Sequence, residues 1–433
     1  MDKLRLGVAQ EIITPSVGGH LAGYNNSIFS TCVNDDLTVT AYYFEQGGQK
    51  ALMISACVCS IRVWLSRHIR DMLAKAHNLP IDHITISCIH THSGPATFGG
   101  YFEEWEGEID REYCETIFIP QILKAAARAV SSAVPVTMGV GIGESRVGVN
   151  RMELRTDNKI YLGQKPWGPY NPNMTVLAFR DETGKPVANM VHYGCHNTAA
   201  GPNTESTRDW SGLMVDALAE RSGAITAFFN GPEGDVGPRL SNGRTTGALS
   251  YVKELGEIAA RDVRAVYDTI TEYKAGDLKV HAKEIRIPMR ARLTKDEAQL
   301  LYEQNKDGKT SGERVRTRRA LAVLDAIEKG VPEKKEDVIT QRVLALGDQV
   351  IVSFPFELFS EIGLRIDAAF PDKHVMRLAL TDGGRGYFAT EDALAYRSYE
   401  VALYRFSGGK DQEYAPYADH ALIMETIRHI EEI

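Results

Sequence analysis

The 433-residue sequence lacks several features that define whole classes of protein. No uninterrupted apolar run reaches about 18 residues, so we expect no membrane-spanning helix. The first 15 residues lack the apolar core of a secretory leader, so no such leader is predicted. Basic residues are outnumbered, with 49 Lys and Arg against 57 Asp and Glu, and the net charge is −8. This charge disfavours nucleic acid as a partner.

Cysteine is scarce, with six residues in the whole chain and none after Cys195. A chain of this length needs no disulfides to fold, and several of the cysteines lie in apolar runs such as residues 50–61. We therefore predict buried, reduced thiols and a cytoplasmic protein. Cys57 and Cys59 form a C-x-C pair on a predicted strand, where packing is a better interpretation than metal binding.

Widespread catalytic motifs are also absent. The sequence contains no GxxxxGK[ST] phosphate loop, no HExxH zinc helix and no GxSxG nucleophile elbow. The glycines of segment 139–143 are not followed by a helical pattern of the right period, so they do not form a dinucleotide fingerprint. The function must therefore be carried by less general patterns.

The chain does contain a regular alternation of apolar and amphipathic segments. Over the first 275 residues, buried strand patterns such as 83–92 alternate with helical patterns such as 251–270. We predict an α/β (mixed α+β) fold in which covered, partly mixed β-sheets are flanked by helices. Residues 293–335 are charged and helical, without a strand pattern. We therefore expect a single domain over residues 1–433 with a helical pair inserted at 293–335.

Candidate functional residues stand where apolar segments end. His90 and His92 close the segment 83–92, and residues i and i+2 of a strand share a face, so the two imidazoles are expected side by side. Ligands of open α/β sheets collect at such strand ends. The pair suits a transition metal, or one metal ligand and one acid–base group. A pair of surface histidines is the alternative.

Three further residues have a similar setting. His196 follows another apolar run, and His192 precedes it by about 13 Å along the strand, too far to share one metal ion. Glu357 follows the run that ends at Pro355, where it suits a metal ligand or a carboxylate in the first turn of a helix. Asp235 lies in a loop rich in Gly and Pro, where it suits catalysis or a turn.

The segments around these residues, in this order, resemble the neutral/alkaline (non-lysosomal) ceramidase family. The resemblance begins with the ITP…LAGY opening at Ile13 to Tyr24 and covers most of that family's N-terminal catalytic domain. The segments are HTHSGP (90–95), CHNT (195–198), GDVGP (234–238), PFELF (355–359) and GYFAT (386–390). HTHSGP is the most specific of them, and the joint occurrence of all five indicates a divergent, bacterial-type family member.

The resemblance implies a zinc ion held by two His, one Glu and one Tyr. Matched motif by motif, these ligands are His90, His196, Glu357 and Tyr387. Two imidazoles, a carboxylate and a phenol leave an open position for water or substrate, as a catalytic zinc site needs. His92 would then lie beside the metal as an acid–base group or oxyanion partner.

Further pocket positions are predicted around this set. Arg151 and Tyr399 match family pocket positions, the first for substrate binding and the second for catalysis. Asp235 is a candidate catalytic helper. Gly237 and Arg239 lie in the same loop and are expected on the substrate side.

Two departures from the family pattern shape the expected chemistry. The family loop reads GDVSP and its Ser supplies a catalytic hydroxyl, whereas Gly237 has no side chain to do so. Zinc can bring the pKa of bound water near 7, so loss of the Ser need not abolish hydrolysis. We also expect the chain to lack the family's C-terminal β-sandwich domain.

Arginines in the candidate segments favour a small polar substrate over a two-chain lipid. These are Arg151, Arg239, Arg385 and Arg397. We predict a zinc-dependent hydrolase that cleaves an amide, or an ester, by metal-activated water. Two alternatives stay open: a metal-dependent lyase or glycoside-cleaving enzyme acting on an acidic sugar derivative, and a non-catalytic ligand-binding family member. The sequence also leaves a homo-oligomer open.

Overall fold

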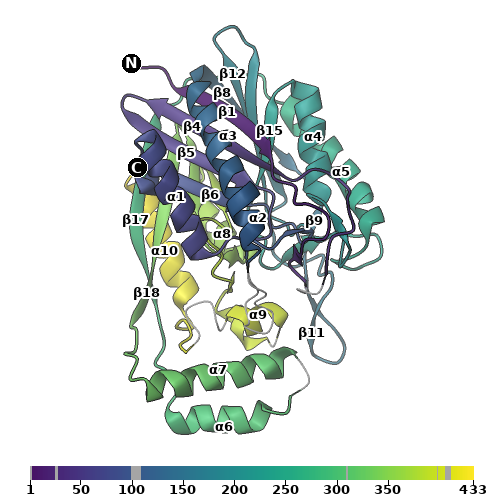
Figure 1. The fold of residues 1–433 in the computed structure, drawn as a ribbon, viewed down its shortest axis with the longest axis vertical. Helices are drawn as coiled ribbons and strands as arrows, with labels where there is room; N and C mark the ends of the chain where they lie inside the picture. Colours follow the sequence, from purple (N-terminus) through teal and green to yellow (C-terminus); the bar gives the residue numbers. More distant parts are fainter. Residues whose placement is uncertain (1, 25–27, 99–108, 309–310, 397, 405–410) are drawn as a thin grey trace.

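The computed structural model describes residues 2–24, 28–98, 109–308, 311–396, 398–404 and 411–433. Two β-sheets stack face to face at its centre, and helices cover the outer face of each sheet (Figure 1). The predicted class, an α/β (mixed α+β) fold with covered sheets, is therefore confirmed.

The larger sheet has eight strands. In spatial order they are β15 (Ile225–Asn230), β13 (Pro186–Tyr193), β12 (Asn173–Asp181), β8 (Val134–Glu144), β1 (Arg5–Ile12), β4 (Thr38–Gln46), β5 (Gln49–Ala56) and β6 (Ile84–Cys88). Neighbouring strands are antiparallel except at the two edges, where β15 pairs parallel with β13 and β6 pairs parallel with β5. The sheet is thus mixed, as predicted.

The smaller sheet has four strands. In spatial order they are β17 (Leu278–Pro288), β18 (Glu336–Leu346), β19 (Gln349–Ser353) and β21 (His374–Leu378). Only the edge pair β19–β21 is parallel. Both sheets therefore combine antiparallel hairpins with parallel pairs at an edge.

Both faces of the larger sheet are buried, because alternate residues of each strand face different layers. In β4, Val39 and Tyr43 face the helices, whereas Tyr42 and Phe44 pack against the smaller sheet. This two-sided burial explains why the strands appear in the sequence as continuous apolar runs rather than as an apolar–polar alternation.

Four helices cover the larger sheet and two cover the smaller one (Figure 1). The first set is α1 (Val63–His77), α3 (Ile119–Ser131), α4 (Trp210–Ser222) and α5 (Leu249–Asp268); the second is α8 (Ser360–Ala368) and α10 (Ala418–Glu431). Within the described residues, no helix has both the length and the apolar character that crossing a membrane requires.

Segment 293–335 holds two helices, α6 (Lys295–Asn305) and α7 (Ser311–Glu328), between β17 and β18. Thr294 and Glu297 form a capping box that starts α6. The pair lies at one end of the molecule, beyond α9 (Tyr399–Tyr404) (Figure 1).

Several short strands pair where the main strands end. They are β2 (Leu21–Ala22) with β7 (Gly94–Pro95), β9 (Gly148–Asn150) with β16 (Val236–Pro238), and β20 (Glu357–Leu358) with β22 (Tyr387–Phe388). Other short elements are β3 (Cys32–Val33) with β14 (Glu205–Ser206), and the hairpin of β10 (Met152–Leu154) and β11 (Ile160–Leu162). The candidate residues of the sequence lie in or beside these short pairs.

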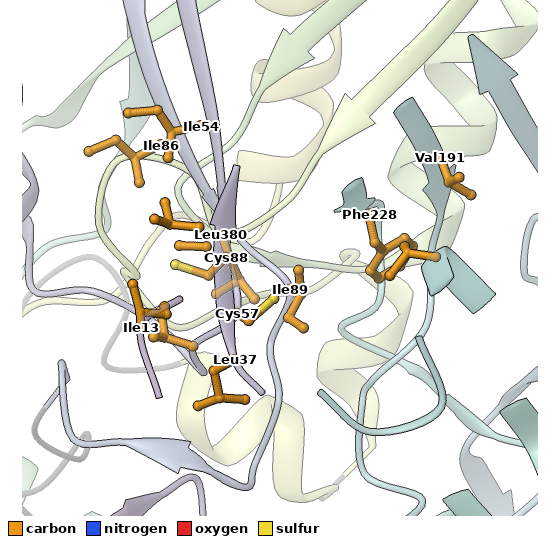
Figure 2. Packing of buried hydrophobic residues seen from close by; sticks show 14 of the residues in the cluster. Ile13, Leu37, Ile54, Cys57, Ile86, Cys88, Ile89, Val191, Phe228 and Leu380 are labelled. Carbon is orange, nitrogen blue, oxygen red and sulfur yellow. The ribbon is translucent and has the colours of Figure 1, made fainter. Parts of the chain in front are cut away.

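The helical segment that leads into α3 is irregular, since α2 (Arg111–Tyr113) continues through a π-helical turn (Cys114–Phe118) into α3. One predicted element differs from the observed one. The strand expected over 83–92 stops at Cys88, because His90 adopts a positive φ of 68° that no strand permits. Figure 2 shows Cys88 and Ile89 held in the core just before this change of direction.

Candidate metal centre

His90 is fixed by the segment that follows β5. Its backbone N–H donates to the carbonyl of Val58 at 3.1 Å, and its ring Nδ1 lies 2.9 Å from the carbonyl oxygen of Cys59. A carbonyl can only accept, so Nδ1 carries a hydrogen and Nε2 is the nitrogen that faces Glu357. The side chain is 3% exposed. The imidazole is thus buried in the orientation that a metal ligand at Nε2 requires.

His196 is held in the same way on the loop after β13. Its Nδ1 lies 2.9 Å from the carbonyl of Glu233 and 3.1 Å from that of Val236. Nε2 is buried and accepts no hydrogen bond from any residue that the structure describes. Burial and the charge of Arg151 lower the pKa of His196 to about 3, so its ring is neutral at pH 7 with an available lone pair.

Glu357 comes from the other half of the chain. It begins β20, whose parallel pairing with β22 sets Glu357 directly beside Tyr387. The carboxylate is 1% exposed, and its Oε2 lies 3.5 Å from Nε2 of His90 and 3.3 Å from Nε2 of His196. The structure therefore brings together three predicted ligands that are separated by more than 100 residues in sequence.

The spacing of these three side chains suits one metal ion. Ligand atoms of all three lie within 4.8 Å of one another. Bonds of 2.0 to 2.2 Å in a tetrahedral zinc site place neighbouring ligand atoms about 3.3 to 3.6 Å apart. The observed nitrogen–oxygen separations of 3.3 and 3.5 Å fall in that range.

The electrostatics of the three groups lead to the same conclusion. Burial by itself would raise the pKa of Glu357, but the two imidazoles hold that pKa well below its usual range. Burial disfavours the charged form of His90, yet Cys59 and Glu357 raise its pKa well above the ordinary value. The triangle thus retains a proton among its members. A divalent cation would replace this proton, as metal binding to imidazole and carboxylate generally does.

Tyr387 lies at the edge of the triangle. Its ring stacks parallel to that of His196 at a centroid distance of 6.5 Å, and its hydroxyl accepts a hydrogen bond of 2.9 Å from Nη2 of Arg151. Arg151 also donates from Nε to Glu400 at 2.8 Å. Arg151 is therefore held rigidly against the phenol.

His92 meets His90, although not by the route expected. The two residues do not share a strand face, because β6 has ended; instead the turn at His90 brings Nε2 of His92 to 3.1 Å from Nε2 of His90. Burial and the neighbouring imidazoles lower the pKa of His92 well below its usual value. Gly23 is required beside it, since a Cβ at this positive φ of 114° would lie 2.5 Å from Cγ of His92.

Asp235 lies next to the centre, but its carboxylate is already engaged. Oδ1 accepts from the backbone N–H of Ser360 at 2.7 Å, and Oδ2 accepts from Asn150 at 2.9 Å and from the Ser360 hydroxyl at 3.1 Å. Its carbonyl accepts from the backbone N–H of Arg151 at 2.8 Å. Asp235 thus ties the 230–238 loop to the start of α8 and to Arg151.

The remaining predicted residues are spread around the site. The Tyr399 ring lies 6.0 Å from that of Tyr387. Arg239 donates to the carbonyl of Gly148 and to the hydroxyl of Tyr170, at 3.3 and 3.4 Å. Arg385 forms an ion pair of 2.8 Å with Asp337. Arg397 lies outside the described residues.

Gly237 is covered by a residue that the sequence did not point to. A Cβ at position 237 would lie 2.6 Å from Cβ of Thr245 and 3.3 Å from its hydroxyl oxygen. Thr245 is 3% exposed. The space that a side chain at position 237 would need is therefore filled from a different loop, and no motif in the sequence marks Thr245.

Two other residues gain importance from the structure. Glu233 is fully buried, and neither carboxylate oxygen has a hydrogen-bond partner among the described residues. Burial raises the pKa of Glu233 well above the usual value and so favours its neutral form. Cys59 contacts His90 through both its carbonyl and its sulfur.

Known proteins share the fold of this chain. Searched against protein-family models, the sequence matches none. Neutral ceramidase B of Dictyostelium discoideum is 24% identical over 247 residues, which cover 53% of this chain and 34% of that protein. The match thus spans about a third of the relative's length. The neutral ceramidase from Pseudomonas aeruginosa superimposes with a TM-score of 0.74 at 17% identity, covering 99% of this chain and 74% of that one.

The chain has the neutral ceramidase fold. A second structure, a ceramidase complexed with C2, agrees, with a TM-score of 0.72, 16% identity and the same coverage. The resemblance to the neutral ceramidases that the sequence indicated is therefore confirmed. Within this neutral ceramidase fold, the His90, His196 and Glu357 triangle lies just beyond the ends of β6, β13 and β19.

Proposed function

We propose that this chain is a zinc-dependent hydrolase that cleaves an amide bond, or an ester, of a small polar substrate. The buried triangle of His90, His196 and Glu357 carries the proposal. Its two imidazoles, each oriented through Nδ1 by a carbonyl, and its spacings of 3.3 and 3.5 Å fit a zinc ion. Tyr387 would be the fourth ligand.

Zinc held there would supply Lewis-acid polarisation of the scissile carbonyl and a lowered pKa for water. The chain's own residues would do the remaining work. His92, neutral at pH 7, offers a ring nitrogen that can take a proton from water and return it to the leaving nitrogen. Arg151 orients the Tyr387 phenol through its 2.9 Å hydrogen bond, and Glu400 in turn holds Arg151.

The pocket side would be formed by Arg151, Tyr399 and the loop with Gly237 and Arg239. In this proposal Asp235 acts by holding that loop and Arg151 in place, because its carboxylate already accepts three hydrogen bonds. The absence of a side chain at Gly237 leaves activated water as the nucleophile. The similar proteins are named ceramidases, which supports an amide as the scissile bond.

Hydrolysis is favoured over the lyase or glycoside-cleaving alternative. That alternative depended on arginines free to bind an acidic sugar. Arg385 is paired with Asp337, Arg239 donates to a carbonyl and a phenol, and Arg151 is committed to Glu400 and Tyr387. We also keep a cytoplasmic location as a proposal, since all six cysteines are free thiols.

Metal analysis tests the proposal first. Purified wild type should contain one zinc ion per chain and His90→Ala should contain almost none, while His83→Ala, with a partly exposed histidine before β6, should match wild type. A screen of N-acyl and ester substrates follows, and turnover in ¹⁸O-labelled water should place the label in the product. Absence of stoichiometric metal, together with no gain of activity on adding Zn²⁺, would overturn the proposal. Product without the label would favour elimination.

A further inference from the structure

Cys59 lies directly beneath the His90 imidazole, on the side away from Glu357. Its Sγ is 3.6 Å from Nδ1 of His90, and its own carbonyl oxygen is 2.9 Å from the same nitrogen. The residue is 2% exposed. One hydrogen, on Nδ1, therefore faces two acceptors that belong to a single residue.

At His196, a second backbone carbonyl occupies the position that the Cys59 sulfur has at His90. There, Nδ1 also faces two acceptors, but both are backbone carbonyls, at 2.9 and 3.1 Å. At His90 only one carbonyl is within reach among the described residues, and the second acceptor is the thiol sulfur. Sulfur is a weak but adequate acceptor at this longer distance. The two ligand histidines thus differ in one contact, and Cys59 supplies it.

The backbone of His90 needs such a support. Its φ of 68° lies in the left-handed region that non-glycine residues rarely adopt, and such strain persists only where surrounding contacts determine it. The contacts come from the segment of Cys59: the Val58 carbonyl accepts from the His90 N–H, and Cys59 accepts from its ring. The 58–59 segment therefore holds both the backbone and the side chain of one predicted ligand.

We propose that Cys59 is a positioning residue of the metal centre, whose sulfur shares the Nδ1 hydrogen of His90 and so fixes Nε2 toward Glu357. The inference rests on the proposed zinc site. Hydrogen bonds of this kind to metal-binding imidazoles fix the ring and raise its basicity, and their loss weakens metal binding by about 10- to 100-fold. The retained carbonyl contact places the expected effect at the lower end of that range.

The test measures zinc affinity, not only activity. Full-length wild type, Cys59→Ala and Cys59→Ser are stripped with a chelator and titrated with Zn²⁺ against a chromophoric competitor. Cys114→Ala is the matched control, because Cys114 is equally buried, at 2% exposed, and has no contact with the histidines among the described residues. Thermal unfolding of the metal-free proteins shows whether each variant is folded.

Cys59→Ala should bind Zn²⁺ about tenfold more weakly than wild type. Cys59→Ser, which keeps an acceptor, should retain most of the affinity, and Cys114→Ala should match wild type. Equal affinity in wild type and both Cys59 variants would overturn this inference while leaving the zinc site intact. Failure of wild type itself to bind Zn²⁺ would overturn the proposed function, and this inference with it.

The absorption spectrum of the Co²⁺-loaded protein separates a positioning role from direct ligation. Cys59 also lies within 4.8 Å of a nitrogen of His92, so a metal ligated by sulfur is the competing arrangement. A positioning role predicts no sulfur-to-cobalt charge-transfer band in wild type, with ligand-field bands that shift in Cys59→Ala. An intense charge-transfer band that disappears in Cys59→Ala would overturn the inference, since Cys59 would then be a ligand.

Discussion

The two sheets contribute differently to the candidate metal centre. The larger sheet supplies two imidazoles, His90 and His196, each oriented by nearby backbone carbonyls. The smaller sheet leads into the segments that supply the carboxylate and the phenol, Glu357 and Tyr387, which are set beside each other by the short β20–β22 pairing. The two imidazoles thus belong to one layer, whereas the carboxylate and the phenol reach them only when the two layers stack.

All four residues nevertheless share one structural origin. His90 follows β6, His196 follows β13, and Glu357 and Tyr387 follow β19 and β21. Each of these strands belongs to one of the parallel pairs in two otherwise antiparallel sheets. Binding sites of α/β proteins form at the carboxyl ends of parallel strands. The parallel strand pairs of both sheets therefore end around one site.

The largest effect is expected from removing the carboxylate of Glu357. Glu357→Ala removes the one anion that both imidazoles face, so zinc affinity should fall by more than about 100-fold, beyond the loss typical of residues that merely support a ligand. Competitive Zn²⁺ titration measures this fall. Glu361→Ala, on α8 and half-buried, is the control and should bind zinc normally. Retention of wild-type affinity in Glu357→Ala would remove the carboxylate from the site.

The role of the imidazoles is tested further at His92, which contacts His90 without belonging to the triangle. His92→Ala should lower kcat by about 10²- to 10⁴-fold, as loss of an acid–base group does, while the zinc content stays at the wild-type level. Steady-state kinetics and metal analysis of the same preparation check both parts. Parallel loss of zinc and activity would instead make His92 a ligand.

The contact between the sheets is tested at His192, which lies on β13 before His196. Its Nε2 donates to the carbonyl of Arg377 on β21 at 3.0 Å, and burial lowers its pKa to about 3. The unfolded chain binds a proton here below pH 6.5 but the native state does not, so stability is full above pH 6.5 and is lost as the pH falls toward 3. The loss from this group should reach about 3 kcal/mol at pH 4.5.

His192→Gln should therefore lose less stability than wild type between pH 7 and pH 4.5. Urea unfolding at both pH values measures the difference. His374→Gln, an exposed histidine at the start of β21, is the control and should follow wild type. An identical pH dependence in wild type and His192→Gln would contradict the neutral, buried state of His192.

The smallest effect is expected at Gly237. Gly237→Ser should lower the free energy of unfolding by about 1–3 kcal/mol, because its Cβ would lie 2.6 Å from that of Thr245. In a protein that already carries Thr245→Gly, the same Gly237→Ser change should cost much less. A double-mutant cycle measured by urea unfolding compares the two costs. Strictly additive effects would show that Thr245 does not fill the space above position 237.

Much of the fold could be predicted from the sequence, because apolar runs and amphipathic periods report burial directly. The helix over 251–270 is observed as α5, and the mixed, covered sheets are present. The positions at which strands end were harder to predict from the sequence. Nothing local in segment 83–92 shows that the strand stops at Cys88, since the positive φ of His90 is imposed by contacts with Val58 and Cys59.

By itself, the sequence determined which residue types stand at strand ends, and its motifs singled out His90, His196, Glu357 and Tyr387 as a set. Only the tertiary structure decided that ligand atoms of the first three lie within 4.8 Å of one another. It also decided that the Asp235 carboxylate accepts hydrogen bonds from neighbouring groups. Likewise, only the fold places Thr245 beside Gly237 and Cys59 beside His90. The physical reason is the stacking of the two sheets. A local pattern encodes the burial of its own segment, whereas the meeting of two strand ends depends on how both sheets pack across the shared apolar layer.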